Sequence, residues 1–188
     1  MLRLLKLSAL TVLSLAVLAV AGTAYGLRLE ERNDFCASCH TQPEVEYYNR
    51  TLKPPSDLSS AHIMQKSVRC IDCHSGAGAF GRADGFTQGV QDLFAYLTNN
   101  YDKPAVTTRP LPDANCVKCH DNIFDDKSIR NHYHYYLRDW QTKEPGRAAR
   151  CVSCHTSHTQ GASRTVRYAV DTRLNPLCAA CHTFSGIK

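Results

Sequence analysis

Ten cysteines in this chain of 188 residues form five C-x-x-C pairs, and a histidine directly follows each pair. Two thiols and an imidazole at this spacing can bind zinc, exchange disulfides or attach haem. Zinc and disulfide sites do not require a histidine after every pair. Five copies of the motif C-x-x-C-H therefore indicate five covalently bound haem c groups. The predicted thioether cysteines are Cys36, Cys39, Cys70, Cys73, Cys116, Cys119, Cys151, Cys154, Cys178 and Cys181. The predicted proximal iron ligands are His40, His74, His120, His155 and His182.

Four histidines remain outside these motifs: His62, His132, His134 and His158. Low-spin electron-transfer haems need a sixth ligand, usually histidine or methionine. We therefore expect each spare histidine to be the distal ligand of a separate haem. The alternative is that they are surface histidines among the aromatic side chains that cover porphyrin edges. Met64 is a weaker candidate for a sixth ligand, because filling a gap in the core is a more common role for methionine.

His132 and His134 are two positions apart in "RNHYHYYL". On a helix, such residues differ by about 200° in direction and cannot share one metal. They are expected to serve two different haems and to fix the distance between them. His158 comes three residues after His155, so it is expected to serve a neighbouring haem. The sequence does not tell which haem each spare histidine serves.

The segment that must hold these groups, residues 33–188, has 156 residues, or about 31 for each of five haems. This is too little protein for five separate pockets around a conventional core. We therefore predict a mainly α fold with long loops, a multihaem cytochrome c domain whose core is the stacked haems themselves.

Two helices are predicted within this domain. Residues 89–97 place apolar side chains at helical spacing, and residues 128–140 do the same with Ser128 as the N-cap. Residues 53–60 and 103–113 are proline-rich and are predicted to be connectors between haem units. No stretch has a convincing strand pattern.

The segment before the first motif is apolar. Residues 7–27 contain no charge and would span about 31 Å as a helix, close to the thickness of a hydrocarbon core. Arg3 and Lys6 precede it, which predicts a cytoplasmic N-terminus and a haem domain on the periplasmic side of the inner membrane. A cleaved signal peptide with a site at residues 19–21 is the alternative. An uncleaved single-pass anchor over residues 1–32 is favoured by the length of the apolar run.

The formal net charge is +5, which alone would be compatible with a nucleic-acid partner. The propionate carboxylates of the predicted haems need lysine and arginine nearby, so the excess is expected to be neutralised internally. Binding of nucleic acid is therefore not expected.

The order of parts resembles the NapC/NirT family of membrane-anchored multihaem quinol dehydrogenases. The resemblance lies in the anchor, in "FCASCH" directly after it and in "SAHIMQKSVRCIDCHSG", and it continues more loosely through the later motifs. It implies oxidation of menaquinol or ubiquinol at the outer membrane face, with electrons passing through stacked haems to a periplasmic or membrane-bound redox partner. The usual member of the family has four haems, whereas this chain has five motifs.

The resemblance also points to residues near the first haem. Family members often place a methionine ligand where this chain has Gln42, so the first haem is expected to be differently ligated or partly open. The family's aspartate near that haem corresponds to Asp92, a candidate proton acceptor, although a solvated helix residue is an equal alternative. The family's lysine before this acid has no clear equivalent, since Gly85 and Phe86 occupy the region and Arg82 is the nearest base.

Three functions remain open on these grounds. The leading one is a conduit that oxidises quinol and delivers the electrons to a partner. The second is a relay subunit of a larger respiratory complex without its own quinone site. The third, reduction of nitrite, hydroxylamine or a sulfur oxyanion, is disfavoured because pentahaem nitrite reductases use C-x-x-C-K and are much larger. A nitrite reductase is not expected.

Overall fold

The computed structural model describes residues 2–39, 42–106, 109–161 and 167–186. Within these ranges the chain is helical, and its only β pairing is an isolated bridge between His155 and Ala169. The predicted mainly α fold is confirmed. The helices are α1 (Leu2–Leu29), α2 (Asn33–Cys39), α3 (Glu44–Thr51), α4 (Leu58–Lys66), α5 (Cys70–His74), α6 (Gly81–Leu97), α7 (Ala114–Val117), the 3-10 helix η1 (Asp121–Phe124), α8 (His132–Lys143), α9 (Cys151–Cys154) and α10 (Asp171–Phe184).

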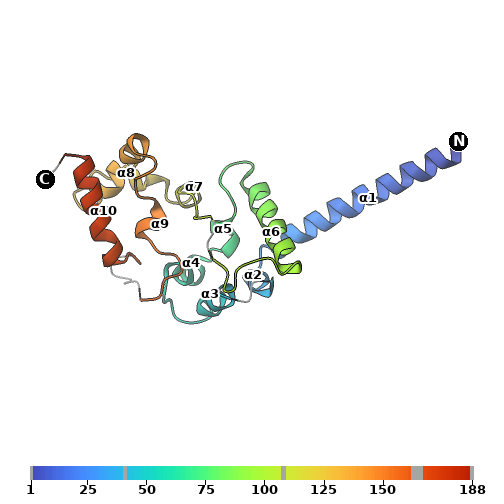
Figure 1. Cartoon of the computed structure of the whole chain (residues 1–188), viewed down its shortest axis with the longest axis horizontal. Coiled ribbons are helices and arrows are strands. Elements are labelled where there is room, and N and C mark those ends of the chain that lie inside the picture. Colours follow the sequence, from blue (N-terminus) through green and yellow to red (C-terminus); the bar gives the residue numbers. More distant parts are fainter. Residues whose placement is uncertain (1, 40–41, 107–108, 162–166, 187–188) are drawn as a thin grey trace.

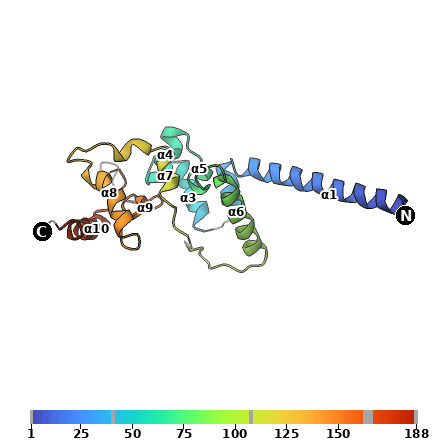
Figure 2. The ribbon, with the colours of Figure 1, turned by 90° about the horizontal axis from the view of Figure 1, so that it is seen from above.

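Helix α1 projects away from the rest of the chain (Figure 1, Figure 2). A window of 18 residues within its segment Arg3–Leu29 has a mean hydropathy of 2.2, and the apolar side chains of the helix are exposed. A helix of 27 residues is about 40 Å long, more than the roughly 30 Å of a hydrocarbon core. By length and composition α1 can therefore cross a membrane once.

The remaining chain has only a small apolar core. The cluster of buried side chains consists of Phe124, Leu137, Trp140 and Ala149, with partners from α7, η1 and α10 around it. The accessible surface is 13456 Å², whereas a compact monomer of 20.9 kDa exposes about 9000 Å². The exposed α1 accounts for part of this excess, and an open interior accounts for the rest.

The C-x-x-C pairs lie on α2, α5, α7 with the turn after it, α9 and α10. These elements follow one another from the end of α1 to the C-terminal end of the molecule (Figure 1). Helix α2 packs on α5, α5 packs on α7, and α9 packs on α10. The chain order of the motifs is thus also their order in space.

Helix α6 is longer than predicted, because it begins at Gly81 and not at residue 89. A Cβ at Gly81 would lie 2.1 Å from the carbonyl oxygen of Gly76, so the turn that starts the helix needs glycine there. A Cβ at Gly85 would lie 3.1 Å from Cα of Ser75, which is a tight but less severe approach. Glycine lowers helix propensity, and close packing of the backbone compensates for it here.

The predicted N-cap of the second helix is wrong. Helix α8 begins at His132 with Asn131 as its N-cap, and Ser128 lies in the preceding turn. The amide of Asn131 donates to the carbonyl oxygens of Ile123 and Asp126, both at 2.8 Å. These bonds fix residues 128–131 as a turn and start the helix three residues later than the apolar pattern suggests.

A fully buried carboxylate, Asp57, joins α3 to α4. It accepts hydrogen bonds from the backbone N–H of Ser60 at 2.8 Å and from the guanidinium of Arg50 at 2.7 Å. Arg50 is itself buried, and it also donates to the carbonyl oxygen of His158 at 3.0 Å. This network fixes α3, α4 and the segment after α9 to one another.

Replacing Asp57 by asparagine should lower the free energy of unfolding by about 3 kcal/mol, because it leaves the buried charge of Arg50 without its closest partner. Guanidinium unfolding of the mature protein, followed by circular dichroism, measures this change. Asp139→Asn is the control, since Asp139 pairs with Lys143 at 2.9 Å on the surface. Equal shifts for the two variants would contradict the role of the buried pair.

Candidate cofactor site

One cavity of about 3880 Å³ runs through the open interior. Ordinary small-molecule pockets measure roughly 300–1000 Å³, so this one is several times larger. Its wall includes all nine cysteines and all eight histidines whose side chains are described. The cavity therefore joins the described parts of all five motifs and the four spare histidines in one continuous space.

Within the cavity each spare histidine faces one motif histidine. The ring centres are 6.0–6.4 Å apart in all four cases. The facing pairs are His62 with His120, His158 with His74, His132 with His182, and His134 with His155. Every pair joins residues from different elements, so folding alone brings them together.

This spacing fits a metal held between two imidazoles. Two ring nitrogens about 2 Å from one ion, on opposite sides of it, put their ring centres roughly 6 Å apart. Among the described residues no three His, Cys, Asp or Glu side chains are grouped as a metal site built from protein alone. Each pair of imidazoles would hold the iron of a bound haem, which would supply electron-transfer chemistry there.

The second ring nitrogen of each spare histidine is held by the protein. Nδ1 lies within hydrogen-bond distance of an oxygen in all four cases, which leaves Nε2 as the nitrogen directed to a metal. The oxygens are the carbonyl of Leu58 for His62 (2.9 Å), the carbonyl of Ile129 for His132 (2.6 Å), Oδ1 of Asn131 for His134 (2.8 Å) and Oγ of Ser59 for His158 (3.1 Å).

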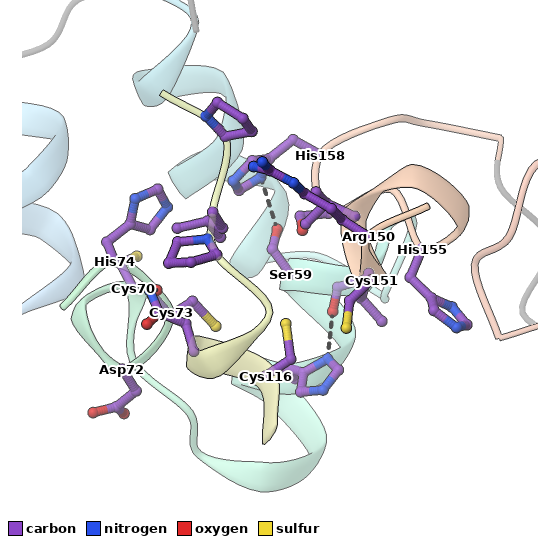
Figure 3. A pocket seen from close by; sticks show the side chains of 18 of the residues that line it. Ser59, Cys70, Asp72, Cys73, His74, Cys116, Arg150, Cys151, His155 and His158 are labelled. Atoms are coloured by element: carbon purple, nitrogen blue, oxygen red, sulfur yellow. Dashed lines mark hydrogen bonds between the residues drawn. The ribbon is translucent and has the colours of Figure 1, made fainter. Parts of the chain in front are cut away.

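His158 has the most elaborate surroundings of the four. Its Nδ1 bonds to Ser59 (Figure 3). The hydroxyl of Ser59 donates to Asp57 at 3.0 Å, and the ring of Tyr47 stacks on His158 with ring centres 4.1 Å apart. Burial, assisted by the nearby imidazole of His74, lowers the pKa of His158 to about 4. The ring is therefore neutral at pH 7, the form that binds a metal.

Side-chain hydrogen bonds to the backbone join successive motifs. Asn33 Oδ1 accepts from the N–H of Cys70 at 2.9 Å, joining the first motif to the second. The amide of Asn115 donates to the carbonyl of Cys73 at 2.8 Å, joining the second to the third. Asp113 Oδ1 then accepts from the N–H of Cys151 at 2.8 Å, joining the third motif to the fourth. These bonds set the spacing between attachment points.

Thiols of successive motifs also approach each other. The side chains of Cys36 and Cys70 are close enough to interact. The same is true of Cys116 and Cys151, and Figure 3 shows their two sulfurs near each other. Groups bound at these successive motifs are therefore close neighbours.

The region of the first motif is described only in part. The side chain of Cys39 and the whole of His40 lie outside the described residues. Gln42 is exposed. Met64 is 50% exposed on α4, and the cavity wall does not include it, so it is not placed beside the motif histidines that the structure describes. Asp92 is half-buried, lies on the cavity wall and accepts a hydrogen bond from Gln88 at 2.8 Å.

Sequence reasoning missed the residues that hold the ligands and join the motifs. Asn33 and Asp113 stand three residues before the first cysteine of their motifs, and this repeated spacing of a polar residue is a signal in the sequence. Asp57 and Ser60 have the spacing of a capping box, which α4 indeed has. Ser59 has no comparable signal, because its partner His158 is 99 residues away.

Comparison with known proteins adds four findings. Residues 22–188 match the family model described as outer membrane cytochrome MtrC/MtrF-like, domains II/IV. The tetraheme c-type cytochrome CymA of Shewanella oneidensis is 27% identical over 169 residues, which cover 75% of this chain and 82% of CymA. The cytochrome c-type protein ImcH of Geobacter sulfurreducens is 29% identical over 131 residues, which cover 66% of this chain but only 24% of ImcH. No solved structure gives a significant match.

Proposed function

Since the chain belongs to the family of outer membrane cytochromes described as MtrC/MtrF-like, domains II/IV, and is a membrane-anchored multihaem cytochrome c, we propose that it oxidises quinol and relays the electrons to a redox partner. The multihaem cytochrome c recognised from the C-x-x-C-H motifs is thereby confirmed, and with it covalently bound haem c. The number of haems, their ligands, the quinol and the partner belong to the proposal.

The observation that carries the proposal is the set of four facing histidine pairs along one cavity. We assign the cysteines of the five motifs as the thioether attachments and each facing pair as the two axial donors of one haem. Bound haem c supplies iron that accepts and passes on one electron at a time. The residues of the chain would supply the ligands and hold their orientation through Nδ1.

The order of the motifs supports a relay. They run from the end of α1 to α10, and the side-chain bonds that join them keep neighbouring attachment points close (Figure 1). Electrons that enter at the first motif would leave near α10. A redox partner is therefore proposed to dock at the end of the molecule opposite to the anchor.

The proposed location follows from the anchor. Residues 1–32 would form a single-pass anchor in the inner membrane, in which Arg3–Leu29 is the span and residues 30–32 lie just outside it. Residues 33–188 would form the haem domain outside the cytoplasm, because Arg3 and Lys6 precede the apolar run. The first motif begins seven residues after the end of α1, so its haem would lie near the membrane surface, where a menaquinol or ubiquinol head group can reach it.

A relay subunit without a quinone site is the second candidate. It is favoured by Gln42 in place of the family's methionine and by the absence of the family's lysine before Asp92. The test is reduction of the purified mature chain by a soluble naphthohydroquinone without any partner protein, followed by haem absorbance. Rapid reduction supports the quinol dehydrogenase, and reduction by dithionite alone supports the relay subunit.

Asp92→Asn should slow reduction by the naphthohydroquinone by on the order of 100-fold, because it keeps the shape of the side chain and removes a proton acceptor. Reduction by dithionite should be unchanged. Asp125→Asn is the matched control, since Asp125 is exposed and is not part of the cavity wall. An unaltered hydroquinone rate in Asp92→Asn would exclude this role for Asp92.

A further inference from the structure

A second carboxylate, Glu30, lies where the anchor meets the haem domain. It follows α1 directly, its side chain is 16% exposed, and it lies on the cavity wall close to Cys36. Its Oε2 is buried and has no hydrogen-bond partner among the described residues. Arg82 of α6 approaches this oxygen to 3.4 Å as an ion pair.

Two glycines allow this approach. A Cβ at Gly89 of α6 would lie 3.2 Å from Oε1 of Glu30, and a Cβ at Gly26 of α1 would lie 3.4 Å from the ring of Phe86. Arg82 also donates to the carbonyl oxygen of Leu27 at 2.8 Å, which holds α6 against the end of α1 (Figure 2). The carboxylate is thus held at the membrane boundary on the surface of the same cavity.

The surroundings of Glu30 suit a proton acceptor. Burial raises its pKa, and the positive charge of Arg82 opposes this effect only in part. A carboxylate whose pKa is raised is a stronger base, so it accepts a proton from a donor more readily. A buried oxygen without a hydrogen-bond partner can accept a donor from a ligand without first losing another bond.

We propose that Glu30 accepts a proton from a hydroquinone bound where α1 meets α6. The inference rests on the proposed oxidation of quinol. A hydroquinone that becomes a quinone breaks two O–H bonds and releases two protons and two electrons. The electrons reduce two ferric centres of the covalently bound haem c, and one proton passes to the carboxylate of Glu30 and from there to water outside the membrane.

Asp92 supplies the acceptor for the other proton. Gly89, which faces Glu30, and Asp92 are one helical turn apart on α6, a rise of about 4.5 Å. Both carboxylates lie on the wall of the same cavity. One hydroquinone loses two protons, and two carboxylates on this wall match the two acceptors that it needs.

Glu30→Gln and Glu30→Asp in the mature full-length protein test the inference. With a soluble naphthohydroquinone as the reductant, Glu30→Gln should lower kcat by on the order of 100-fold with little change in KM, while reduction by dithionite stays the same. Glu30→Asp keeps a carboxylate and should recover part of the rate. Glu31→Gln should not change the rate, because Glu31 is 55% exposed and pairs with Arg69 at 3.7 Å.

Each outcome decides between a chemical and a structural role. Glutamine preserves the shape of glutamate better than aspartate does. A rate for Glu30→Gln equal to or above that for Glu30→Asp, or a loss seen only as a higher KM, would therefore overturn the inference. If dithionite reduces the wild-type protein and the hydroquinone does not, the proposed oxidation of quinol is refuted, and the inference with it.

Discussion

Replacing Cys178 and Cys181 together by alanine should give a mature chain that carries four covalently bound haem groups, where the wild-type chain carries five. The two thiols of a C-x-x-C pair are the only covalent attachment that a c-type haem needs, so losing both removes the whole group. The affected motif lies on α10, opposite to the anchor (Figure 1). Its loss should therefore leave the motifs on α2 and α5 loaded.

Intact-mass spectrometry counts the haems directly. Ala179→Ser is the control, since Ala179 lies between the two cysteines, is exposed and should leave five haems in place. A wild-type mass with fewer than five haems would contradict the assignment of all ten cysteines. The detection of free thiols or disulfides in the mature chain would do the same.

His134→Ala should convert one low-spin haem to high spin and leave the other low-spin haems unchanged. His134 faces His155 at a ring-centre distance of 6.0 Å, with the two rings within 7° of parallel. Removing one axial imidazole leaves the iron with a single strong axial donor, which is the condition for a high-spin ground state. Low-temperature EPR of the oxidised protein measures the change.

His132→Ala should remove a different low-spin signal, since His132 faces His182 on α10. The double variant should lose both signals. Tyr133→Phe, between the two histidines, is the control and should keep all of them. If the two histidine variants lose the same signal, or if neither loses one, the assignment of two haems to these neighbouring histidines is wrong.

The attachment chemistry could be predicted from short stretches of the chain. C-x-x-C-H places two thiols and an imidazole within five positions, so the chemistry follows from covalent geometry and needs no tertiary contact. The same holds for the anchor, because crossing a membrane depends on the length and polarity of one segment. The helices were predicted less well, since α6 owes its first two turns to close packing of glycines and α8 begins at the turn fixed by Asn131.

The partner of each spare histidine was decided by tertiary structure. His158 comes three residues after His155 in the chain yet faces His74, and His62 precedes the second motif yet faces His120 in the third. Such pairs depend on how α4, α5, α7 and α9 pack and on which oxygen holds Nδ1. Glu30 is a similar case, because its burial depends on Gly89 and Arg82 of a helix more than fifty residues away. Contacts between distant segments are set by the free energy of the whole packed chain, and no local pattern of residues encodes them.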